Sequence, residues 1–150
     1  MEKEKFKKLL LNISVCAMSC DGHIDDLEIK ELQQIEERSP YFSKVDLSDS
    51  LRNSIGIAID SYDTFQESVL SNLNNADLNI VQELSVLEIS MALVAADNKL
   101  EDSEIKFINL LRKYLKVDDI LIEERFGKID YLELGNSKKN EFNRPPELEI

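Results

Sequence analysis

The chain has 150 residues, 43% of them apolar, with four Gly, three Pro and no Trp, which suits one domain with an ordinary core and argues against a turn-rich sandwich or barrel. Its net charge of −12 excludes nucleic acid and anionic membrane surfaces as direct partners, because binding either requires a cationic surface. A cation or a basic partner protein fits this charge better.

The first predicted helix lies near the N-terminus, where apolar residues recur at helical spacing from Phe6 to Cys20. Lysines precede this run, as in a signal sequence, but Glu2 and Glu4 dilute the positive region and Asn12 interrupts the apolar one. No uncharged stretch is long enough to span a bilayer. We therefore expect a cytoplasmic protein that does not insert directly into a membrane.

The later helices follow from the same apolar spacing. A second helix carries Leu27, Leu32 and Ile35, and we expect Asp63 to cap a fourth helix. The apolar positions of the remaining predicted helices are Leu47, Leu51, Ile55, Ala58, Ile59 and Tyr62; Phe65, Val69 and Leu73; Ile80, Leu84, Leu87, Met91 and Val94; and Ile105, Ile108, Leu111 and Leu115. A last amphipathic piece covers roughly 118–129.

The chain contains an internal repeat at an offset of 76 residues. Residues 11–35 align with 87–111 without a gap, with eight identities in 25 positions. Each copy has the pattern helix, acidic loop, helix, and two copies are too few for a solenoid. We therefore predict an all-α fold: a pseudo-symmetric bundle of about six to eight helices built from this duplicated unit, in one domain over 1–134. The polar residues 135–150 are expected to form a flexible tail.

Two cysteines lie four residues apart on the first helix. Cys16 and Cys20 align with Ala92 and Ala96, so small size is the property that the two copies share. We interpret both cysteines as packing residues that let helices approach closely. A disulfide between them is not expected in a cytosolic protein.

The two loops are acidic, covering 21–28 and 97–104. Helix capping explains part of this pattern, since Asp25 is a good N-cap and Glu28 follows it at capping-box spacing. Capping does not explain Asp21 and Asp97, which face the negative end of a helix dipole. If the bundle brings the loops together, a bound cation would relieve the repulsion between their carboxylates. All-oxygen ligands favour Ca²⁺, Mg²⁺ or Mn²⁺, although the spacing is not that of an EF-hand.

The two loops and the helix ends before them resemble a TerB-like domain, the family of the tellurite-resistance TerB proteins, which is related to the N-terminal domain of some membrane-anchored J-domain co-chaperones. The pattern is Asp-Gly-x-Ile-Asp-x-x-Glu after a helix end of small residues, and the resemblance covers about Phe6 to Phe126. Cys20 replaces the usual alanine, Asn98 replaces glycine, and residues 39–75 cannot be matched. No J-domain follows.

This resemblance implies an all-helical bundle with an acidic metal-binding patch, associated with stress response or phage defence at the inner face of the membrane. It implies Asp21, Glu28, Asp97 and Glu104 as the metal ligands, with Asp25 and Glu101 as further members of the set. A protein partner, in a complex linked to the membrane, is expected on the same ground.

We therefore predict a non-enzymatic binding module whose paired acidic loops hold a divalent cation or a basic partner. The alternative is a purely structural interaction module in which the carboxylates only cap helices. No catalytic constellation is evident, because His23 is the only histidine and aligns with Lys99, and no Ser, Thr or Cys has a recognisable base.

Overall fold

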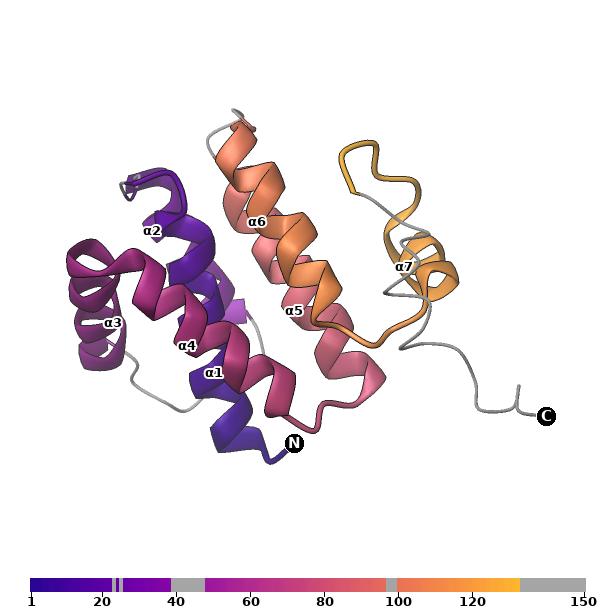
Figure 1. The fold of residues 1–150 in the computed structure, drawn as a ribbon, viewed down its shortest axis with the longest axis horizontal. Helices are drawn as coiled ribbons and strands as arrows, with labels where there is room; N and C mark the ends of the chain where they lie inside the picture. The colour runs from indigo at the N-terminus through magenta and orange to yellow at the C-terminus, as the bar shows by residue number, and fades with distance from the viewer. Residues whose placement is uncertain (23, 25, 39–47, 97–99, 133–150) are drawn as a thin grey trace.

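The computed structural model describes residues 1–22, 24, 26–38, 48–96 and 100–132 (Figure 1). These residues form seven α-helices and no β-strand, so the prediction of an all-helical bundle is confirmed. The helices are α1 (Lys3–Ser19), α2 (Asp26–Arg38), α3 (Ser48–Asp60), α4 (Tyr62–Asn75), α5 (Ile80–Val94), α6 (Asp102–Lys113) and α7 (Asp119–Phe126). None of them is long and apolar enough to cross a membrane.

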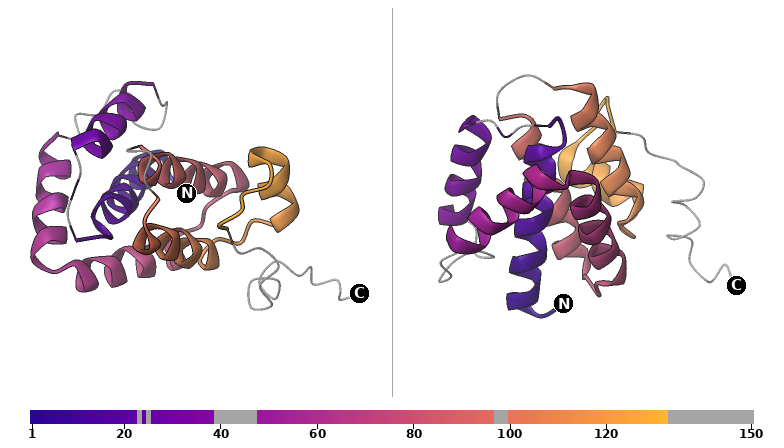
Figure 2. Two further views of the ribbon diagram at one scale, coloured as in Figure 1. Left: turned by 90° about the horizontal axis from the view of Figure 1, so that it is seen from above. Right: turned by 60° about the vertical axis from the view of Figure 1, so that its left-hand side comes forward.

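Helix α1 is the centre of the bundle. It packs against α3, α4 and α5, and α2 to α6 lie around it when the bundle is seen from above, with α7 beyond α5 and α6 (Figure 2, left). From Leu9 to Ser19 every residue except the half-buried Asn12 is buried. A helix that is covered on nearly all sides must be apolar nearly all round, which explains the apolar run near the N-terminus.

The repeat in the sequence is a repeat in the packing. Helices α1 and α2 form the first copy, and α5 and α6 form the second. Each first helix contacts the second helix of its own copy and also that of the other copy, so α1 contacts α6 and α5 contacts α2. Equivalent positions are buried alike: Ser14 and Ser90 are both fully buried, and Glu28 and Glu104 are both 2% exposed.

The helices between the copies differ in detail from the prediction. The helical conformation is interrupted at Ser61, which is the N-cap of α4. Tyr62 therefore begins α4 instead of ending α3. Asp63 is therefore not a cap but lies in the first turn. The Tyr62 hydroxyl donates a hydrogen bond to the Cys16 carbonyl oxygen at 3.2 Å, and this contact joins α4 to α1.

Three residues predicted to face the core are exposed. Leu27 is 51%, Ile59 is 68% and Ile80 is 55% exposed. All three lie in the first or last turn of a helix, where the neighbouring helix no longer covers the apolar face. Helical spacing alone does not show where that cover ends.

The last helix covers most of the predicted 118–129 piece. Asp118 caps α7 by accepting a hydrogen bond from the Ile120 N–H at 3.2 Å. The helix ends at Gly127, whose φ of 77° is in the left-handed region that favours glycine. Leu132 is buried against the core. The predicted tail, 135–150, lies outside the described residues.

Candidate functional site

The acidic loops belong to one end of the bundle. Helices α1 and α5 both end there, and α2 and α6 both begin there (Figures 1 and 2). Helix α1 is followed by Gly22, whose N–H donates to the Ser19 carbonyl at 3.0 Å and whose φ is 96°. This backbone conformation, at the C-terminal end of α1, is one that favours glycine. We call this region the acidic end and define it by Cys20, Asp21, Glu28, Glu101 and Glu104.

The predicted metal ligands differ in accessibility. Asp21 is half-buried and Glu101 is exposed, whereas Glu28 and Glu104 are each only 2% exposed. Asp25 and Asp97, the two other predicted ligands, lie outside the described residues. His23, the only histidine, also lies outside them.

Carboxylates from both copies of the repeat raise the pKa of one thiol, that of Cys20. The pKa of the Cys20 thiol is raised to about 12, chiefly by burial and then by the negative charges of Glu104, Asp21 and Glu28, in that order of size. Glu104 belongs to the second copy, while Asp21 and Glu28 belong to the first. Carboxylates that are far apart in the sequence therefore lie close to the same thiol at the acidic end.

The buried glutamates occupy helix-capping positions. Glu104 Oε1 accepts a hydrogen bond from the N–H of Glu101, the N-cap residue of α6, at 2.9 Å. Glu28 is the third residue of α2, as Glu104 is of α6. A carboxylate near a helix N-terminus is stabilised by the free N–H groups and the helix dipole. Capping therefore accounts for the position of Glu104 without a metal.

The described residues alone do not form a metal site. Among them, no group of three or more His, Cys, Asp or Glu side chains is arranged to hold a metal ion. A divalent cation at the acidic end would therefore need ligands from 25 or 97, in addition to accessible carboxylates such as Asp21 and Glu101.

Sequence reasoning missed Cys20 as a member of the acidic end. The prediction treated it and Cys16 as packing residues, and both are free in the structure. Cys16 is fully buried, which fits that role, and burial raises its thiol pKa strongly. Cys20 is only half-buried and lies among carboxylates. Its position directly before Asp21 in the sequence was the feature that could have indicated this surrounding.

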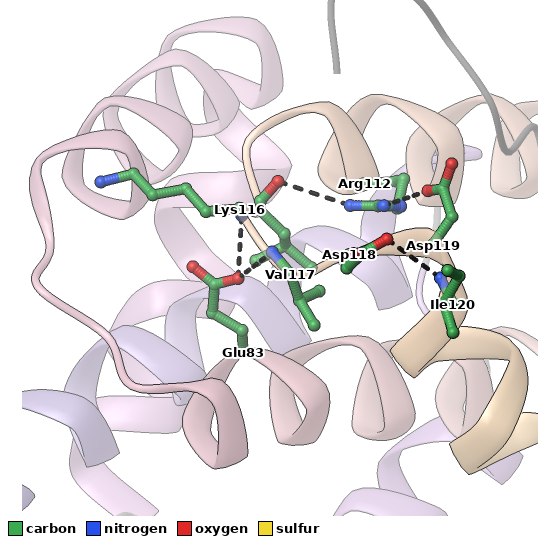
Figure 3. A network of polar contacts seen from close by, with 8 residues as sticks. Glu83, Arg112, Lys116, Val117, Asp118, Asp119 and Ile120 are labelled. Carbon is green, nitrogen blue, oxygen red and sulfur yellow. Dashed lines mark hydrogen bonds and ion pairs between the residues drawn. The ribbon is translucent and has the colours of Figure 1, made fainter. Parts of the chain in front are cut away.

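Sequence reasoning also missed a buried polar network at the other end of α5. Glu83, which is 6% exposed, accepts hydrogen bonds through Oε1 from the N–H groups of Lys116 at 2.8 Å and Val117 at 2.7 Å (Figure 3). The Lys116 ammonium group extends away from this carboxylate. Glu83 therefore fixes the connection between α6 and α7 to the first turn of α5.

An arginine secures the same connection from the other side. Arg112 is 2% exposed, forms an ion pair with Asp119, and donates to the Leu115 carbonyl oxygen at 3.4 Å (Figure 3). An arginine can remain charged in the core only when it is paired in this way. These contacts hold the connection between α6 and α7 in place.

The comparisons with known proteins add no family assignment. No protein-family model, no curated protein and no solved structure matches this chain. The resemblance to TerB-like domains therefore stays a prediction from the loop residues.

Proposed function

We propose that this protein is a non-enzymatic binding module whose acidic end binds a divalent cation or a basic segment of a partner protein. The observation that carries the proposal is that α1 and α5 end, and α2 and α6 begin, at the same end of the bundle, so that Asp21 and Glu28 of the first copy and Glu104 of the second all lie near the Cys20 thiol. The net charge of −12 adds a long-range attraction for cations.

The accessible residues define what would touch the ligand. Glu101 is exposed and Asp21 is half-buried, so both can be reached from solvent, whereas the carboxylates of Glu28 and Glu104 are buried and act only through their negative charge. The proposal also includes a role in stress response or defence, a cytoplasmic location and a partner in a membrane-linked complex. Only the resemblance to TerB-like domains supports these three points.

Thermal unfolding with Ca²⁺, Mg²⁺ or Mn²⁺ added tests whether the protein binds a divalent cation. An ion that binds the native state at a hundred times its Kd stabilises it by about 2.7 kcal/mol, which for this chain length raises Tm by about 5–10 °C. The variant Asp21→Asn should reduce this rise, and Asp97→Asn should do the same. Glu67→Gln is the matched control, because Glu67 is exposed in the middle of α4 and does not belong to the acidic end.

A purely structural role is the second candidate, and the hydrogen bond from the Glu101 N–H to Glu104 favours it. In that case no ion shifts the melting temperature, and Asp21→Asn behaves like Glu67→Gln. A lysine-rich peptide then separates the two remaining possibilities: binding that depends on Asp21 supports a basic partner, and the absence of binding supports the structural role.

A further inference from the structure

A groove lies between the N-terminal end of α5 and the start of α7, away from the acidic end. It encloses a cavity of about 250 Å³. Its apolar lining comes from Leu78, Ile80, Val117 and Leu121. Glu83 also lines it, but one oxygen of that carboxylate is used by the two N–H groups of the α6–α7 connection. The groove wall is therefore held in place by the network of Figure 3.

Exposed apolar side chains gather at this groove. Ile80 is 55%, Val81 is 62% and Ile120 is 65% exposed, and these are three of the seven large exposed hydrophobic residues in the described part of the chain. Ile80 lines the cavity, Val81 follows it on α5, and Ile120 precedes the lining residue Leu121 on α7. Single exposed apolar residues are ordinary, whereas a cluster around a cavity is typical of a binding surface.

The charges beside the groove are mostly negative. Asp118 lines it, and the exposed Glu123 and Glu124 lie one turn after Ile120 on α7. Asp77, which precedes Leu78, is exposed as well. Lys116 is the one cationic side chain among the lining residues that the structure describes.

These charges select the occupant. A second copy of a chain with a net charge of −12 would be repelled, and so would an anionic membrane surface. A partner helix with an apolar stripe and basic flanks satisfies both the apolar lining and the carboxylates. Helix-in-groove binding of this kind is a common mode of peptide recognition.

We propose that the groove between α5 and α7 docks a basic amphipathic helix of a partner protein. Apolar side chains of that helix enter the cavity beside Ile80 and Leu121, and its basic residues contact Asp118 and the carboxylates on α7. This surface is distinct from the acidic end, so it does not depend on the function proposed above.

A short synthetic helix of leucine and lysine tests the proposal with the full chain, with methyl NMR to locate the contact. Binding should shift the methyl signals of Ile80, Val81 and Ile120. The variant Ile120→Asn should weaken the affinity at least about fivefold, because a largely exposed isoleucine would lose its burial in the complex. The matched control is Ile59→Asn, since Ile59 is 68% exposed on α3, and it should leave the affinity unchanged.

Other outcomes would overturn the proposal. Methyl shifts confined to Leu27 and Leu100 would place the peptide at the acidic end. Equally tight binding of a helix of leucine and glutamate would show that the carboxylates beside the groove do not select a basic partner. A concentration-dependent dimer that Ile120→Asn abolishes would make a second copy the occupant. Binding that requires removal of residues 136–150, which include Lys138 and Lys139 in the sequence, would make the chain's own C-terminal segment the occupant.

Discussion

Replacing Glu83 by alanine should destabilise the fold by about 3 kcal/mol. Its carboxylate is buried and accepts two backbone hydrogen bonds, at 2.8 Å from Lys116 and 2.7 Å from Val117. A hydrogen bond to a charged group contributes about 1.5–3 kcal/mol, and we take the lower value for each because both bonds share one oxygen. For this chain length, the corresponding fall in Tm is about 6–12 °C.

Two further variants make this prediction specific. Glu83→Gln keeps an oxygen acceptor and removes only the charge, so it should cost about half as much. Glu88→Ala removes a carboxylate of the same helix whose pair with Arg125 is about half exposed, and it should cost less than about 1 kcal/mol. Urea unfolding followed by circular dichroism measures all three. Equal losses for Glu83→Ala and Glu88→Ala would refute the assigned role of the buried carboxylate.

The remaining predictions concern a backbone position, a buried ion pair and a thiol. Gly22→Ala should destabilise the fold by about 1 kcal/mol because φ at Gly22 is 96°, whereas Gly56→Ala, in the exposed middle of α3, should stabilise the fold by about 0.5–1 kcal/mol. Urea unfolding that ranks the two variants in the opposite order would contradict this prediction. Arg112→Ala should cost about 3–5 kcal/mol by removing the buried guanidinium group from its ion pair with Asp119, against less than about 1 kcal/mol for Arg38→Ala in an exposed pair. Similar calorimetric melts for the two would count against the role of the buried pair. Because the pKa of Cys20 is raised to about 12, a thiol reagent at pH 8 should label native Cys20 at least about a hundredfold more slowly than the urea-unfolded chain, with the rate rising as pH rises; equal rates would show that the thiol is not shielded.

The arrangement of the helices could be predicted largely from the sequence. Residues 11–35 and 87–111 share a pattern, and the structure gives both copies the same helix pairing. The capping pattern also identified Glu28 and Glu104 as equivalent, and both are buried. These features are local or repeated, so the chain itself carries the signal.

The contacts that fix the far end of α5 could not be predicted. Glu83 meets Lys116 and Val117 across more than thirty residues, and no sequence pattern marks that meeting. Its equivalent in the first copy is Lys7, a residue of opposite charge that is also buried, so the repeat gives no guide here. Such contacts depend on how α6 turns into α7, which is a tertiary property.

The central place of α1 has a consequence for synthesis of the protein. Of the seven helices that the structure describes, α1 is translated before the others, yet one of its main packing partners, α5, begins only at Ile80. Until that later helix emerges, the apolar side chains of α1 that it will cover face water, and a nascent chain in this condition is a target for aggregation or for chaperone capture. The side of α1 that packs against α5 can therefore be enclosed only after α2, α3 and α4 have been translated.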